Sequence, residues 1–153
     1  MMQTGALIVA AGKSSRMGDF KPMLQLGSIS IAQRVINNFR QAGISKIVVV
    51  TGYNADALER HLASNHVIFL RNEDYETTHM FDSVRIGLEY LKDKVDTVLF
   101  TPVDVPLFTA HTVTQMLSLG QPLVTPVCNG TPCHPILIRS SLIESILSND
   151  GNT

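Results

Sequence analysis

Residues 7–24 read LIVAAGKSSRMGDFKPML, an apolar run that leads directly into a loop with two glycines and three cations. Gly12 and Gly18 allow backbone conformations that other residues avoid, so peptide N–H groups in this loop can turn toward an anion. The cations that could supply compensating charge are Lys13, Arg16 and Lys21. This stretch therefore predicts a strand followed by a loop that holds the phosphates of a nucleotide.

The glycine spacing disfavours two common nucleotide loops. Five residues separate Gly12 from Gly18, one more than in a Walker loop, and no Lys-Ser or Lys-Thr pair follows Gly18. The dinucleotide fingerprint Gly-x-Gly-x-x-Gly does not match either. A tight turn in which Ser14 and Ser15 cap the next element, with solvated cations, is the alternative. The position directly after a buried strand favours phosphate binding.

Length and charge restrict the class of protein. A chain of 153 residues has the size of one ordinary domain, and we expect a single domain over residues 1–153. The balance of 12 basic and 13 acidic residues argues against a nucleic-acid partner, which requires a basic surface. No apolar run reaches the length of a membrane span. With two cysteines and no signal-type N-terminus, we expect a cytoplasmic protein without a membrane partner.

Strand and helix patterns alternate along the chain. The apolar runs at 6–11 and 47–51 are typical of parallel strands buried on both faces. Between them, apolar residues recur at helical spacing from a cap at Ser30 to a stop at Gly43. Further helices are expected at 56–63, 81–91, 109–119 and 140–147, and further strands at 67–70, 97–101, 123–127 and 135–138. This alternation predicts a three-layer α/β/α sandwich with a mostly parallel sheet and ligands beyond the carboxyl ends of its strands.

Asp104 is a candidate metal ligand. It follows the strand expected at 97–101 and stands between Pro102 and Pro106, which stiffen the turn. A carboxylate held rigidly at the end of a strand can bind Mg²⁺, which takes one or two carboxylates together with substrate phosphates. Asp is also common in turns for purely structural reasons, and the residues alone leave that alternative open.

Polar residues after two further strands could face the same edge of the sheet. Asn72 follows the strand expected at 67–70, and Ser83 lies near the start of the next helix, although a loop with a helix cap would explain both.

His134 precedes the last strand and could contact a substrate, but a lone His is more often structural. We expect no hydrolase triad, because no Ser or Cys nucleophile partners this His. Neighbouring Cys133 would point to the opposite face of an extended chain.

Taken together, these segments resemble the molybdenum cofactor nucleotidyltransferases, and most closely the branch that transfers a cytidylyl group from CTP to the phosphate of molybdopterin. The matches follow the order of the family's motifs over nearly the whole chain. They are the loop from Ala10 to Gly18 with Lys21, the strand ending at 50–53, Asn72 with Tyr75, Met80 with Ser83, Asp104-Val105-Pro106, and His134-Pro135. Ala-Ala-Gly at 10–12, rather than Ala-Gly-Gly, is similar to the cytidylyltransferases.

The resemblance implies a Rossmann-like nucleotidyltransferase fold of the GT-A type with Mg²⁺ as cofactor. It implies catalytic roles for Arg16, Lys21 and Asp104, the last of which is also the metal ligand, and a substrate contact for His134. The nucleotide would be bound by Ala10, Ala11, Gly12, Lys13, Ser14, Ser15, Gly18, Asn72 and Ser83. The implied partners are CTP and a phosphorylated acceptor such as molybdopterin, with a molybdoenzyme or a second copy of the chain as further partners.

The chain departs from the family pattern at several positions. Val103 and Cys133 stand where the family has glycines, and Thr78 stands where it often has one. Family members continue well beyond Gly151 and carry there another Asp that helps to hold the metal, so we expect this chain to lack the family's C-terminal segment. Two alternatives remain open. One is a GTP- or UTP-dependent transferase acting on another phosphorylated acceptor, such as a sugar phosphate; the other is a non-catalytic binding protein or chaperone for the pterin cofactor.

Overall fold

The computed structural model describes residues 3–11, 25–26, 29–53, 55–74, 77, 80–103, 108–128 and 130–148. One sheet has the strand order β5-β4-β1-β6-β10-β7. Its strands are β1 (Thr4–Ala10), β4 (Lys46–Thr51), β5 (Ile68–Arg71), β6 (Thr97–Pro102), β7 (Leu123–Val124) and β10 (Ile136–Arg139). From β5 to β6 all neighbours pair in parallel, whereas β10 pairs antiparallel with both β6 and β7. The sheet is therefore mixed and mostly parallel, which confirms the prediction.

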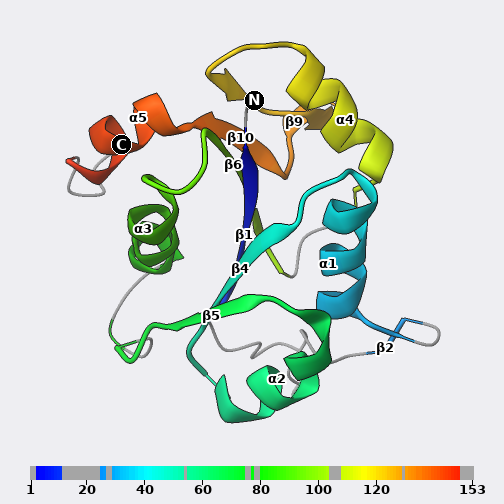
Figure 1. Ribbon diagram of the computed structural model, residues 1–153, viewed down its shortest axis with the longest axis vertical. Helices are drawn as coiled ribbons and strands as arrows, with labels where there is room; N and C mark the ends of the chain where they lie inside the picture. Colours follow the sequence, from blue (N-terminus) through cyan, green and yellow to red (C-terminus); the bar gives the residue numbers. More distant parts are fainter. Residues whose placement is uncertain are drawn as a thin grey trace.

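Helices cover both faces of this sheet. The α-helices of the described residues are α1 (Ile31–Gln41), α2 (Ala55–His61), α3 (Met80–Leu91), α4 (Ala110–Ser118) and α5 (Ser140–Leu147). Figure 1 shows α3 and α5 on one side of the sheet and α1 and α4 on the other. The three-layer α/β/α arrangement expected from the alternating patterns is thus present.

Strand β1 lies at the centre of the core and is buried on both faces. Ala6 and Ile8 pack into the apolar cluster that contains buried side chains of α1, α2 and α4. Leu7 and Val9 point to the opposite face, into the cluster formed with α3 and α5. A strand covered by helices on both sides has no solvent-facing positions, which explains its continuous apolar sequence.

The predicted limits of the helix after β1 are confirmed. The Ser30 hydroxyl accepts a hydrogen bond from the N–H of Gln33, and the Gln33 side chain accepts one from the N–H of Ser30, which forms a capping box at the start of α1. At the other end, Gly43 has a φ of 91°, a left-handed conformation that glycine adopts without a steric penalty.

The strand predicted at 123–127 is wrong as a single element. Only Leu123 and Val124 pair with β10, and the chain then leaves the sheet. Pro126 has no N–H to donate to a strand ladder, so pairing with β10 cannot continue through it. Val127 and Cys128 form β8 instead, which pairs with β9 (Thr131–Pro132) in a separate hairpin.

Two smaller differences concern short elements. The helix expected at 56–63 ends as α2 at His61 and is followed by a 3₁₀ turn, η2 (Ala63–Asn65). A two-stranded pairing of β2 (Gln25–Leu26) with β3 (Ile29–Ser30) was not predicted. Within the described part of the chain, none of the helices has the length and apolar character needed to cross a membrane.

The order of the strands defines where a ligand is expected. From β1 the chain passes through α1 to β4 and on to β5, and it then returns through α3 to β6 on the other side of β1. Helices α1 and α3 consequently lie on opposite faces of the sheet (Figure 1). In open α/β sheets, such a reversal opens a crevice at the carboxyl ends of the strands, and ligands bind there.

Candidate functional site

Backbone hydrogen bonds hold the exits of β4 and β6 against β1. The N–H of Tyr53, just after β4, donates to the carbonyl of Ala11 at 2.9 Å. The N–H of Val103, just after β6, donates to the carbonyl of Val9 at 3.0 Å. Ala10 and Ala11, two of the predicted nucleotide-binding residues, are both buried at this edge. The three strand ends therefore form one continuous edge, which we call the carboxyl edge.

Asn72 extends this edge to β5 and links it to α3. Its backbone N–H donates to the carbonyl of Thr51 at the end of β4, at 2.7 Å. Its side-chain Nδ2 donates to the hydroxyl of Ser83 at 2.9 Å, and its Oδ1 accepts the N–H of Asp74 at 3.0 Å. Asn72 and Ser83 are 5% and 2% exposed. The structure thus brings together two residues that the sequence placed on separate elements.

His134 reaches the same edge because β10 runs antiparallel to β6. Ile136 pairs with Phe100, so the residues before Ile136 lie beside the carboxyl end of β6. The half-buried His134 ring meets Phe100 edge-on, with 5.6 Å between ring centroids, and burial lowers the pKa of His134. Cys133, the preceding residue, is disulfide-bonded and supplies no free thiol.

An ion cluster at the carboxyl ends of β4 and β5 was missed by the sequence reasoning. Arg71 Nε and Nη2 donate to the two carboxylate oxygens of Glu59 at 2.9 and 3.0 Å, and Nη2 also contacts Asp56. The hydrogen bonds from Arg71 lower the pKa of Glu59 against the effect of partial burial, and those to Glu59 and Asp56 raise the pKa of Arg71. The only local signal was a pair of acidic residues one helical turn apart on α2.

A hollow of about 280 Å³ lies next to Asn72 at this edge. It is lined by Gly52, Ala55, Arg71, Asn72 and Glu73. Among the residues that the structure describes, no group of three or more His, Cys, Asp or Glu side chains is placed to hold a metal ion. Asp104, the carboxylate that the sequence predicts as a metal ligand, lies outside the described residues.

Several predicted site residues fall outside the described residues. These are Arg16, Lys21 and Asp104 of the catalytic set and Gly12, Lys13, Ser14, Ser15 and Gly18 of the nucleotide-binding set. Ala11 directly precedes Gly12, and Val103 directly precedes Asp104. Both Ala11 and Val103 lie at the carboxyl edge. The described residues at this edge are therefore Ala10, Ala11, Asn72, Ser83 and His134 from the predicted set, with Glu59 and Arg71 in addition.

Comparison with known proteins identifies a family and several relatives of this chain. The family model described as the MobA-like NTP transferase domain matches residues 6–153. The chain is 32% identical over 149 residues to the molybdenum cofactor cytidylyltransferase of Escherichia coli, a match that covers 95% of this chain and 76% of that protein. It is 31% identical over 118 residues to the bifunctional protein GlmU of Staphylococcus haemolyticus. That match covers 76% of this chain and 26% of the relative, so the chain spans about a quarter of it.

Solved structures show the same fold. A nucleotidyl transferase from Methanothermobacter superposes with a TM-score of 0.81 at 20% identity, over 98% of this chain and 78% of that one. A protein from Mycobacterium tuberculosis, solved in complex with manganese, gives a TM-score of 0.80 at 17% identity, over 99% of this chain and 78% of that one. At such identities the likeness concerns the fold alone.

Proposed function

The chain belongs to the MobA-like NTP transferase domain family, and on this premise we propose that it transfers a cytidylyl group from CTP to the phosphate of molybdopterin, with release of pyrophosphate. Membership makes it a nucleotidyltransferase. The observation that carries the finer proposal is the 32% identity to a molybdenum cofactor cytidylyltransferase over 95% of the chain. The single carboxyl edge, which gathers predicted nucleotide and acceptor residues, supports the same proposal.

In this proposal the nucleotide lies along the carboxyl edge. Ala10 and Ala11 lead into the glycine loop, in which Gly12, Lys13, Ser14, Ser15 and Gly18 bind the phosphates. Asn72 and Ser83 contact the nucleoside from the β5 side. His134, on the β6 side, contacts the acceptor. The neutral form that burial favours in this imidazole can both donate and accept a hydrogen bond.

The proposal includes a divalent cation at the carboxyl edge. Val103 is 5% exposed and its N–H is bonded to the carbonyl of Val9, so the chain enters the Asp104 segment from the carboxyl edge. A carboxylate is the oxygen ligand that Mg²⁺ prefers, and we propose that Asp104 holds it. Bound Mg²⁺ would neutralise charge on the phosphate oxygens and orient them.

The protein's own contribution to the reaction is positioning and charge. The attacking group is a phosphate of the acceptor, which is already ionised at neutral pH, so no side chain has to remove a proton from it. Arg16 and Lys21 would neutralise the charge that develops as pyrophosphate leaves. Holding the two phosphates in line converts a bimolecular encounter into a reaction within one complex.

Pyrophosphate release from CTP, GTP and UTP with molybdopterin as acceptor tests the proposal. We expect release with CTP at a kcat/KM at least about tenfold above that for the other nucleotides. Release only with GTP or UTP, or only with sugar phosphates as acceptors, would favour a GTP- or UTP-dependent transferase that acts on another phosphorylated acceptor. A folded chain that binds the pterin and releases no pyrophosphate would be a binding protein instead.

A lysine pair provides the matched control for this assay. Lys21→Ala should lower kcat more than it weakens CTP binding, because the charge of Lys21 is proposed to stabilise the phosphoryl group in the transition state. Lys46→Ala should leave both constants unchanged, since Lys46 is the first residue of β4 and lies at the end of the strand away from the carboxyl edge. Equal loss of turnover and affinity in the Lys21 variant would contradict its assigned role.

A further inference from the structure

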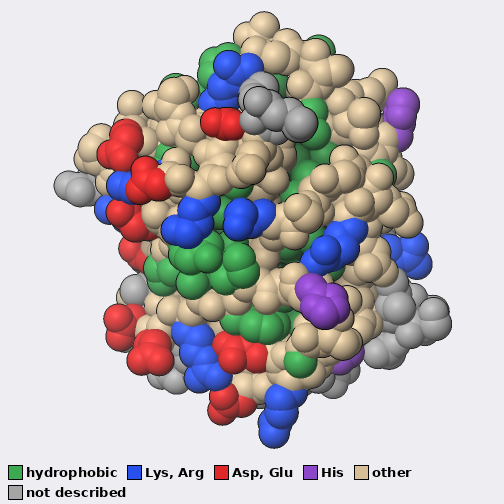
Figure 2. All heavy atoms as spheres, viewed as in Figure 1, with side chains coloured by type: hydrophobic (Ala, Val, Ile, Leu, Met, Phe, Trp, Pro, Cys, Tyr) green, Lys and Arg blue, Asp and Glu red, His purple; other side chains and the backbone are tan. Residues whose placement is uncertain are grey.

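Glu59 and Arg71 form a fork-to-fork contact rather than a simple charge pair. Arg71 Nε lies 2.9 Å from Oε2 of Glu59, and Nη2 lies 3.0 Å from Oε1. Such paired parallel hydrogen bonds fix the relative orientation of the two side chains as well as attracting them. Figure 2 shows acidic and basic side chains side by side at the end of the molecule where α2 lies.

The same carboxylate holds a third donor from the neighbouring strand. Oε2 of Glu59 accepts the hydroxyl of Thr51 at 3.0 Å, and Thr51 is fully buried at the end of β4. The carbonyl of Thr51 in turn accepts the backbone N–H of Asn72. Because Asn72 directly follows Arg71, these contacts close a ring that runs from Glu59 through Thr51, Asn72 and Arg71 back to Glu59.

Stability alone is a poor explanation for this ring. The side chain of Arg71 is 42% exposed, and exposed ion pairs contribute little to the free energy of unfolding. The Glu59 side chain is 23% exposed, and its two oxygens receive three side-chain donors from two strands. These hydrogen bonds fix the backbone of β5 relative to β4 at the point where Asn72 leaves the sheet.

We propose that Glu59 is a positioning residue for the nucleotide site, which acts by holding Arg71 and Thr51 so that Asn72 is presented to the nucleoside in a fixed orientation. The kinetic part of this inference rests on the proposed function. The structural part does not, because the backbone hydrogen bond from Asn72 to Thr51 can be probed in the free protein. Asn72 passes the effect on to Ser83 and Asp74 through its side-chain hydrogen bonds.

The expected kinetic signature follows from the place of Asn72 in the site. A contact to the nucleoside is made equally in the ground state and the transition state, so its loss raises KM and leaves kcat unchanged. A residue needed only for folding would instead lower the amount of active enzyme and so the apparent kcat. The ratio of KM to kcat effects therefore distinguishes positioning from a purely structural role.

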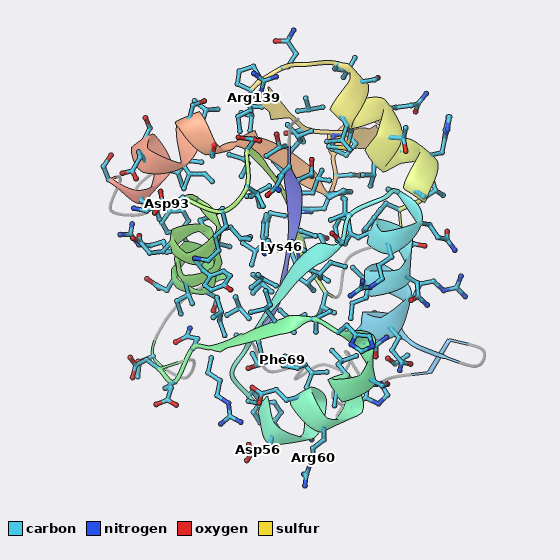
Figure 3. The ribbon with its side chains drawn as sticks, in the orientation of Figure 1. Lys46, Asp56, Arg60, Phe69, Asp93 and Arg139 are labelled. Atoms are coloured by element: carbon cyan, nitrogen blue, oxygen red, sulfur yellow. The ribbon has the colours of Figure 1, made fainter. Side chains whose placement is uncertain are left out.

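Hydrogen–deuterium exchange in the free protein tests the structural part with Glu59→Gln. The Gln amide has one acceptor oxygen in place of two, so it cannot hold all three donors. We expect the backbone amide of Asn72 to exchange about tenfold faster than in the wild type, as the local opening becomes easier. Arg60→Gln is the control, because Arg60 is the next residue on α2 and points away from the molecule (Figure 3). Unchanged exchange at Asn72 in Glu59→Gln would overturn the proposal.

Steady-state kinetics with CTP tests the rest. We expect KM for CTP to rise about tenfold in Glu59→Gln with kcat within about twofold of the wild type, and no change in Arg60→Gln. Arg71→Lys should behave like Glu59→Gln, since Lys keeps the charge but not the fork, and it serves if Glu59→Gln fails to fold. Wild-type kinetics in Arg71→Lys would overturn the proposal. If the wild type itself releases no pyrophosphate, the proposed function fails while the exchange experiment still decides this inference.

Discussion

Asn72 is a buried amide whose orientation is determined by its partners. Its Oδ1 accepts a backbone N–H from Asp74, a group that can only donate, so the oxygen and nitrogen of the amide cannot be exchanged. Its Nδ2 then necessarily faces the hydroxyl of Ser83, at 2.9 Å. Burying a polar group without a hydrogen bond costs free energy of folding, so the two hydrogen bonds together favour this one orientation of the amide. The amide is therefore oriented before any nucleotide arrives.

Replacing Ser83 by Ala should disturb both stability and nucleotide binding. The change removes the buried hydrogen bond between Nδ2 of Asn72 and the Ser83 hydroxyl, and such a loss typically costs about 0.5–1.5 kcal/mol in the free energy of unfolding. Urea denaturation measures this cost, and titration with CTP should show weaker binding of the nucleotide. Ser145→Ala on the exposed face of α5 is the control and should change stability by less than about 0.5 kcal/mol. Equal stability of the two variants would contradict the importance of the Asn72–Ser83 contact.

His134 should give the protein a measurable pH dependence. Burial lowers its pKa below the value of 6.5 that it has when exposed, so the unfolded chain binds this proton more readily than the folded one. The free energy of unfolding therefore rises with pH between the folded and unfolded pKa values and is independent of this group above the unfolded value. As pH falls from 7.5 to 5.5, the wild type should lose more stability than His134→Gln. Urea unfolding at both pH values measures this, and parallel losses would contradict it.

At the scale of elements, the contact of α3 with β1 depends on the absence of one side chain. A Cβ added to Gly87 would lie 2.1 Å from Cδ1 and 2.8 Å from Cδ2 of Leu7, far inside contact distance. Leu7 is fully buried between the sheet and α3, so its side chain has little space to move. Gly87 therefore allows the helix to approach the central strand closely.

Gly87→Ala should destabilise the protein even though Ala is the better helix former. Ala gains about 1 kcal/mol in helix propensity, but overpacking of a filled core typically costs about 1–3 kcal/mol. The double variant with Leu7→Ala gives the decisive measurement. The new methyl group would then partly fill the cavity left by Leu7, so the two changes together should cost less than the sum of the single changes. Additive free energies of unfolding would show that the two residues do not meet.

The limits of α1 were predictable from the sequence, whereas the end of α2 and the short strands were not. The cap at Ser30 and the stop at Gly43 depend on residues within one turn, and the structure confirms both of them. A two-residue strand such as β7 is defined by the partner that it meets, here β10, which is distant in the sequence. The local pattern at 123–127 shows apolar residues but not where pairing stops.

At the scale of the whole molecule, the edge of the site was predictable and the ion cluster was not. Parallel strands place their carboxyl ends on one side, so the location of Asn72 followed from the fold class. The Glu59–Arg71 contact joins a helix to the strand after it, and neither residue carries a local signal for the other. His134 reaches the edge because β10 reverses direction, a property of the sheet that no single segment contains.

Binding at this edge should stabilise the entire fold, because the site is assembled from the ends of several strands that exist together only in the native state. At a concentration about 100 times its Kd, a ligand of the native state adds about 2.7 kcal/mol to the free energy of unfolding. For a chain of this size, each kcal/mol corresponds to about 2–4 °C, so CTP with Mg²⁺ should raise Tm by about 5–10 °C. EDTA should abolish most of this increase, because Mg²⁺ is proposed to bind together with the phosphates of the nucleotide. A CTP-induced shift that persists in EDTA would contradict the role assigned to the metal, and equal shifts with CTP, GTP and UTP would contradict the preference for cytidine.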